Sequence, residues 1–93
     1  MFVRVVRFTE VTTERVESLV ATIDETGPPP GVAIKKLQLV FDEAQGTAVV
    51  LQYFDGEESL RAGAETFAAM DPSETPGSRV SVDTGELKIE REP

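Results

Sequence analysis

The side chains with which most enzymes carry out acid–base, nucleophilic or metal chemistry are almost absent from this chain. It contains no His, Cys or Trp, and no Asn occurs in it either. Without His and Cys, a chain has no zinc site of the usual kind, no His-ligated haem, and no Ser-His-Asp or Cys-His nucleophile. The sequence therefore predicts neither a metal site nor a bound cofactor.

The polar side chains that remain within apolar, strand-like stretches are better suited to binding. The candidates for a binding site are Arg4, Lys36, Gln38, Gln52, Phe54 and Phe8. A few convergent polar groups beside aromatic side chains are typical of a pocket for a small organic molecule, here an acidic or aromatic one. Alternatively, Arg4 and Lys36 pair with carboxylates of a partner subunit or reach solvent, since their aliphatic stems can cover apolar surface. Both interpretations remain open.

Length and charge limit the possible partners. The 93 residues, of which 40% are hydrophobic, are expected to form one domain spanning 1–93. The net charge of −8 argues against nucleic acid and against anionic membrane surfaces, because both attract clusters of Lys and Arg. No run approaches the ~20 apolar residues of a membrane span. The chain starts directly in strand-like sequence without a signal-peptide pattern, so we expect a cytoplasmic protein.

A hairpin over residues 33–54 is expected to position most of these candidates. Two apolar runs, 34–41 and 48–54, are separated by a polar stretch at 42–46 that ends in Gly. Two strand-like runs separated by a few residues of this kind predict an antiparallel β-hairpin.

A strand and a helix are expected before the hairpin. Residues 2–8 alternate as a strand does, and Thr12 is placed to cap a helix that follows. The apolar face of that helix consists of residues at helical spacing, namely Val16, Leu19, Val20 and Ile23. The sequence GPPPG at 27–31 ends the helix, because Pro cannot continue it, and predicts a stiff connector.

A second helix and a last extended segment follow the hairpin. Asp55 with Glu58 three residues later resembles a capping box. The expected buried stripe of this helix consists of Leu60, Ala64, Phe67, Ala68 and Met70. Asp71-Pro72 and Pro76-Gly77 mark the exit loop. Residues 79–90 are interrupted at 83–86, which indicates either a bulge in one long strand, the version we favour, or a turn between two short strands.

The order strand, helix, strand, strand, helix, strand predicts an α+β, ferredoxin-like fold. It consists of a four-stranded antiparallel sheet with two helices on one face and with the first and third strands in the middle. Strand alternation then divides the side chains between the two faces. The helix-covered face is expected to carry Val3, Val5, Leu37, Leu39, Phe41, Val49, Leu51, Tyr53, Val80 and Val82. The other face is expected to carry Phe2, Arg4, Val6, Phe8, Lys36, Gln38, Val40, Val50, Gln52, Phe54, Arg79 and Ser81.

The second of these faces leads to a prediction about assembly. Its apolar members would form a patch that soluble monomers rarely expose. A second copy that packs sheet against sheet would cover the patch with closed two-fold symmetry. We therefore expect a homodimer that encloses a space between its two sheets, and this space is where a ligand would lie.

The stretch that enters the second helix resembles a known family. Residues 52–63 read QYFDGEESLRAG. With the order of elements over nearly the whole chain, this resembles the dimeric α/β-barrel superfamily, and most closely its antibiotic-biosynthesis-monooxygenase branch. Members often have a Trp, an acidic turn, a Leu and then a His here. Phe54 stands in place of the Trp, Leu60 matches the Leu, and Gly63 takes the place of the His.

The resemblance implies a dimeric barrel, but the departures weigh against the family's chemistry. Some relatives degrade haem held by that His, which Gly63 excludes here. Others oxidise aromatic substrates with O₂ and no cofactor, using Asn, Trp, Tyr and Arg. Asn and Trp are missing here, and parity places Tyr53 on the helix side. The possible functions are a small-molecule-binding dimer, a cofactor-independent monooxygenase-like oxidoreductase, and a non-catalytic interaction or assembly module.

Overall fold

Strands and helices follow one another in the order that the apolar patterns predict. The computed structural model describes residues 1–27, 31–70 and 75–92. Its elements are β1 (Phe2–Thr9), α1 (Thr13–Thr26), β2 (Ile34–Asp42), β3 (Thr47–Phe54), α2 (Glu57–Ala68) and β4 (Ser78–Glu86). The prolines 28–30 of the predicted connector and Asp71-Pro72 of the predicted exit loop lie outside the described residues.

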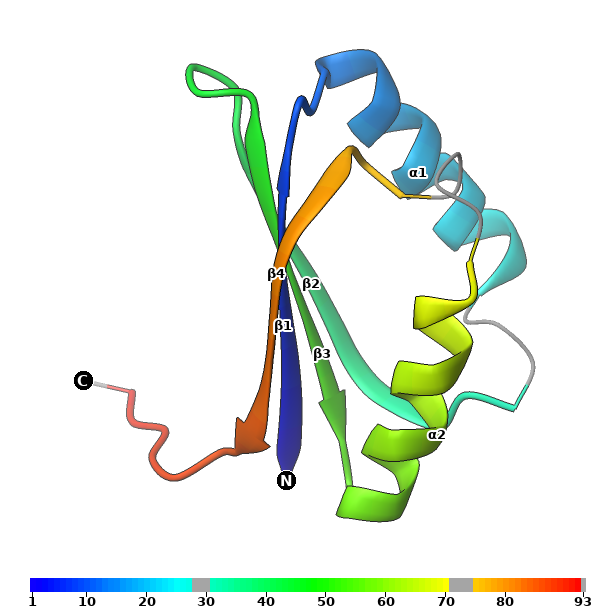
Figure 1. Ribbon diagram of the computed structural model, residues 1–93, viewed down its shortest axis with the longest axis vertical. Helices are drawn as coiled ribbons and strands as arrows, with labels where there is room; N and C mark the ends of the chain where they lie inside the picture. Colours follow the sequence, from blue (N-terminus) through cyan, green and yellow to red (C-terminus); the bar gives the residue numbers. More distant parts are fainter. Residues whose placement is uncertain (28–30, 71–74, 93) are drawn as a thin grey trace.

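The four strands form one antiparallel sheet in the order β2-β3-β1-β4, so β1 and β3 are central as expected. Both helices cover one face of this sheet, and the other face carries no helix (Figure 1). This confirms the predicted ferredoxin-like α+β fold. In the described part of the chain, neither helix is long and apolar enough to cross a membrane.

The helix ends agree only in part with the predictions. Thr12 caps α1 as expected, because its Oγ1 accepts a hydrogen bond from the Arg15 amide at 3.2 Å. The predicted capping box of α2 is wrong: the N-cap residue is Gly56, which has no side chain to offer. Asp55 instead lies 3.2 Å from Lys35 Nζ in an exposed ion pair. Glu57 and Glu58 still place negative charge in the first turn, where the helix dipole favours it.

The predicted β2–β3 hairpin is confirmed, but its register differs from the one that the parity assignment required. Asp42 pairs directly with Thr47, which leaves a loop of four residues rather than the five that the apolar pattern suggested. Gly46 closes the loop with φ of 66°, and its amide donates to the Asp42 carbonyl at 2.9 Å. A shift of one residue moves every side chain of a strand to the opposite face.

The predicted facing is consequently correct for β2 and wrong for β1 and β3. Leu39 and Phe41 of β2 pack against the core, as expected. Leu39 pairs with Val50, and Val50 pairs with Val6, so the even positions of the central strands face the helices. The buried residues of β1 and β3 on this face are Arg4, Val6, Phe8, Ala48, Val50, Gln52 and Phe54.

Two apolar clusters hold the helices on the sheet. The first consists of Val6, Phe8, Val11, Ala48 and Val50, with Val16 of α1 packed against it. The second consists of Val32, Phe54 and Leu60, with Phe2, Ile34 and Phe67 packed against it. Leu60 and Gly63 of α2 are buried, whereas no residue of α1 is fully buried.

The last extended segment is one strand over Ser78–Glu86, so the favoured strand over 79–90 is wrong beyond residue 86, and the irregularity also lies earlier than expected. Arg7 pairs with Ser81 and Phe8 pairs with Arg79, so Val80 is an extra residue in β4. Arg79 therefore shares the helix-covered face with Phe8, which corrects its predicted place. The strand ends at Glu86, and the Leu87 amide donates to the Met1 carbonyl at 2.8 Å.

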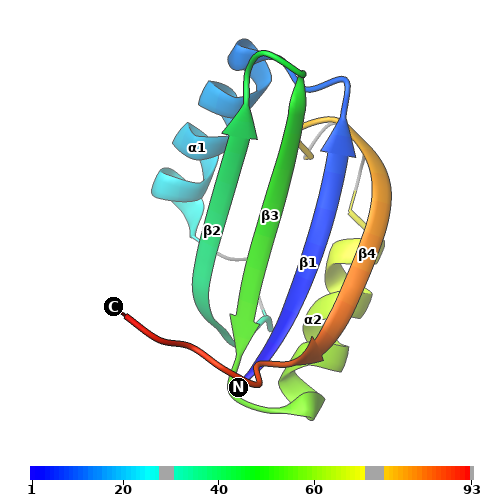
Figure 2. The same ribbon diagram turned by 90° about the vertical axis from the view of Figure 1, so that its left-hand side faces the viewer.

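We use the name open face for the side of the sheet without helices, which is turned toward the viewer in Figure 2. It carries Val3, Val5, Arg7, Lys36, Gln38, Val40, Val49, Leu51, Tyr53, Ser81 and Asp83. Val40 is 59% exposed there, and Val3 and Val5 of β1 are half-buried. The C-terminal segment after Glu86 leaves the sheet on this side (Figures 1 and 2).

Candidate functional site

Arg4 is a cation in an unusually buried position. It lies in the middle of β1 on the helix-covered face and is only 4% exposed. Its Nη1 donates to Gln52 Oε1 on the neighbouring strand at 2.9 Å, and the guanidinium carbon lies 5.5 Å from the centre of the Phe67 ring. A cation at this distance from an aromatic ring is attracted to it.

These contacts do not satisfy the whole guanidinium. Arg4 Nε is buried and has no hydrogen-bond partner among the described residues. Burial, and after it the positive charge of Arg79, lowers the pKa of Arg4, although an arginine remains charged at neutral pH. An under-satisfied buried charge is costly, so a further hydrogen-bond acceptor at this position would be stabilising.

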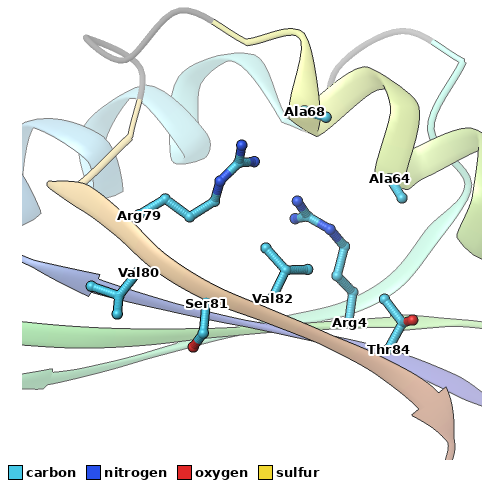
Figure 3. A pocket seen from close by; sticks show the side chains of 8 residues that line it. All are labelled: Arg4, Ala64, Ala68, Arg79, Val80, Ser81, Val82 and Thr84. Atoms are coloured by element: carbon cyan, nitrogen blue, oxygen red, sulfur yellow. The ribbon is translucent and has the colours of Figure 1, made fainter.

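A pocket of about 380 Å³ opens above Arg4, between α2 and β4. It is lined by Arg4, Ala64, Ala68, Arg79, Val80, Ser81, Val82 and Thr84. Ala64 and Ala68 lie on α2, where their small side chains leave room above the sheet (Figure 3). Arg4, Arg79 and Val82 point into this space (Figure 3). The pocket therefore combines apolar walls with two guanidinium groups.

Arg79 supplies the second charge, and it reaches the pocket because of the extra residue at Val80. Its guanidinium lies on the same side of the sheet as that of Arg4, and the two side chains converge below α2 (Figure 3). Within the described residues, neither Arg4 nor Arg79 forms an ion pair with a carboxylate. Two positive charges that line one pocket favour an anion between them.

The six candidates from the sequence do not come together as one site. Arg4 and Gln52 are joined by a hydrogen bond, and Arg4 lines the pocket. Phe8 lies in the first apolar cluster and Phe54 in the second, so both are core residues rather than pocket walls. Arg4, Gln52, Phe54 and Phe8 were predicted to share one face with Lys36 and Gln38 of β2. This prediction is wrong, because the hairpin register places the first four residues on the helix-covered face and the two β2 residues on the open face.

Lys36 and Gln38 lie on the open face around Tyr53, and both are exposed. The Tyr53 hydroxyl donates to Gln38 Oε1 at 2.9 Å, and Lys36 Nζ lies 5.2 Å from the centre of the Tyr53 ring. Tyr53 was expected to face the helices, and the register corrects this too. These three residues form a polar contact on the sheet surface, away from the pocket.

Gly63 and Phe54 close the space in which the resemblance places a haem-binding His. A Cβ at Gly63 would approach Phe54 Cε1 to 2.6 Å, and the Phe54 ring is fully buried. The close approach of α2 to the sheet thus depends on the missing side chain at this position.

Sequence reasoning missed Arg79, Val82 and Thr84 as pocket residues. Val82 was expected to face the helices, but as core, and Arg79 was assigned to the other face because strict alternation does not foresee a bulge. Ala64 and Ala68 were expected as part of the buried stripe of α2. Around an arginine, the same small residues leave a pocket instead.

The pocket offers positively charged and apolar groups. Its lining residues supply two cations, apolar carbon and the Thr84 hydroxyl, whereas the Ser81 side chain points away from the pocket (Figure 3), and no carboxylate or phenol is among them. In the described part of the chain, no group of three His, Cys, Asp or Glu residues could hold a metal ion.

Comparison with solved structures agrees with this fold. A crystal structure of an antibiotic biosynthesis monooxygenase superposes with a TM-score of 0.58 at 13% identity, covering 98% of this chain and 100% of that chain. An uncharacterized NIPSNAP domain protein from Burkholderia xenovorans gives a TM-score of 0.46 at 14% identity, covering 100% and 99%. No family model matches the chain, and no curated protein matches it significantly. The first likeness confirms the ferredoxin-like fold that the resemblance predicted.

Proposed function

We propose that this chain is a small-molecule-binding protein that acts as a homodimer, with one binding pocket in each protomer between α2 and β4. The ligand is an acidic or aromatic organic molecule. The observation that carries this proposal is Arg4, a cation that is 4% exposed, keeps an unpartnered Nε and lies in the lining of a pocket. A ligand acceptor group would complete its hydrogen bonding.

The size and lining of the pocket support this function. Ligand pockets are usually clefts of about 300–1,000 Å³ with apolar walls and a few polar groups. The pocket here, at about 380 Å³, suits a molecule at the small end of this range. Ala64, Ala68 and Val82 would contact an apolar body, while the guanidinium groups would bind a polar or charged end.

The open face supports the homodimer. Val5, Val49 and Leu51 form an apolar row across the central strands, and no helix of this protomer covers it. Arg7 and Asp83, on the same face, have opposite charges. In an isologous interface such groups can pair across the two-fold axis. The face on which the dimer forms is therefore separate from the pocket, and the ligand lies within a protomer rather than between the two sheets.

Three compounds with one apolar body test the binding function. They are 2-naphthol, 2-naphthoate and 2-naphthyl phosphate, which differ in charge. We expect at least one to raise the melting temperature of the protein, because a ligand that binds only the native state stabilises it. Ala68→Phe, which fills the pocket, should abolish this response. Ala62→Phe is the matched control, since Ala62 is exposed on the same helix and does not line this pocket.

Two outcomes would contradict the proposal. One is that none of the three compounds raises the melting temperature. The other is that the response survives Ala68→Phe unchanged in a variant that is folded by circular dichroism. Either result would leave the pocket without a ligand-binding role.

A further inference from the structure

We infer that the pocket selects a dianionic head group, such as a phosphate monoester of a small organic molecule, and that Arg4 and Arg79 bind this group together. The inference rests on the proposed function, whose pocket it uses. It adds the charge class of the ligand and makes Arg79, an exposed residue at the edge strand, a specificity-determining residue.

The positions of the two arginines carry the geometric part of this inference. Arg4 comes from a central strand and Arg79 from the edge strand beside it, and both side chains rise toward α2 (Figure 3). Arg4 is buried whereas Arg79 is exposed, so one guanidinium lies deep in the pocket and the other at its entrance. An anion between them would be bound from two sides.

Hydrogen bonding supports the same arrangement. A guanidinium has five N–H donors, and Gln52 accepts from only one nitrogen of Arg4, leaving Nε free. Phosphate oxygens accept several hydrogen bonds in the fork geometry that arginine offers. The Thr84 hydroxyl also lines the pocket and can donate to the same group.

The charges of the two arginines favour a dianionic ligand over a monoanionic one. Arg4 and Arg79 bring two positive charges, and the described residues supply no carboxylate to pair with either. A single carboxylate would leave one of the two cations uncompensated. A phosphate monoester carries about −1.5 to −2 at pH 7 and compensates both. The chain has a net charge of −8, yet none of the carboxylates that the structure describes forms an ion pair with either arginine.

Isothermal titration of the same three naphthalene compounds, together with inorganic phosphate, tests the inference at constant low ionic strength. We expect 2-naphthyl phosphate to bind at least about tenfold more tightly than 2-naphthoate, because its dianionic head group can accept charged hydrogen bonds from both guanidinium groups. Arg79→Gln should weaken the phosphate ester about 10- to 100-fold and leave 2-naphthol unchanged. Arg79 is exposed, so this variant should fold.

Arg61→Gln is the matched control, because it removes the same charge from an exposed position of α2 that does not line the pocket. It should leave the affinity for the phosphate ester unchanged. In the wild-type protein, the ester should also shift the Nε–Hε resonance of Arg4, a readout that does not depend on affinity. Inorganic phosphate binding as tightly as the ester would support the dianion class and identify free phosphate as its source.

Equal affinities for the three naphthalene compounds, or an unchanged ester affinity in Arg79→Gln, would overturn the inference. In that case the proposed function would still stand, provided that binding is lost in Ala68→Phe. If no compound binds, the proposed function fails as well, so the two failures are distinguishable.

Discussion

Arg4 and Gln52 pair across β1 and β3 in a layer that is otherwise apolar. Their neighbours along the same face, Val6, Val50 and Phe54, are buried core residues. A polar pair in such a place is retained at a cost in stability, since apolar residues of similar size would pack there without desolvating a charge. Its retention is consistent with a role in binding rather than in folding.

Removal of one partner of the Arg4–Gln52 pair should destabilise the protein. Gln52→Leu should lower the free energy of unfolding by about 1–3 kcal/mol, because it leaves a second nitrogen of the buried Arg4 without an acceptor. The double variant Arg4→Met with Gln52→Leu should recover that loss and match the wild-type protein or exceed it. Urea denaturation of the three proteins checks both expectations. A double variant less stable than Gln52→Leu alone would mean that Arg4 is needed for the fold.

Among the elements, α1 is held less firmly than α2. None of its residues is fully buried, and Val20, which was expected on its apolar face, is 44% exposed. In contrast, α2 buries Leu60 against Phe54 and allows close contact at Gly63. Local opening is easiest where few apolar groups are buried.

Hydrogen exchange should reflect this difference. We expect the amides of α1 to exchange faster than those of β1 and β3, by a sub-global opening that does not unfold the sheet. The amides of α2 near Leu60 should be protected more strongly than those of α1. Exchange followed by NMR under native conditions measures both. Protection in α1 equal to that in the central strands would contradict the packing described above.

The strands and helices could be predicted from the sequence, whereas two local irregularities could not. Apolar alternation and helical spacing predicted every strand and helix and the central place of β1 and β3, because these patterns directly reflect burial. Which face each side chain of the central strands takes depends on whether the hairpin loop has four or five residues. The polar stretch Asp42 to Gly46 is compatible with either loop length. The bulge at Val80 was equally invisible, because both neighbours fit a regular strand. These two local irregularities decide which arginines line the pocket.

For the whole molecule, the two faces of the sheet differ in the groups that they carry. The helix-covered face contains the core and the pocket, and the open face is available for a second copy. Val6 and Val50, which the sequence placed at the dimer interface, are 1% and 8% exposed within one protomer. A charge at either position would therefore unfold the protomer rather than separate two protomers.

Leu51→Glu tests the dimer instead, because Leu51 lies on the open face of a central strand. We expect this variant to be a folded monomer of 10.1 kDa, while the wild-type protein sediments at twice that mass. Val20→Glu on α1 adds the same charge on the opposite side and should remain dimeric. Sedimentation equilibrium at micromolar concentration distinguishes the two states. A wild-type monomer, or a Leu51→Glu dimer, would contradict an interface on the open face.

The most direct test is the position of a bound ligand relative to the two faces of the sheet. Methyl NMR of protein labelled at Ala, Val and Leu, titrated with 2-naphthyl phosphate, reports on both faces of the sheet at once. We expect the methyl groups of Ala64, Ala68 and Val82 to shift, because they line the pocket below α2. Shifts confined to Val49 and Leu51 would place the ligand between the two sheets and contradict a pocket within each protomer.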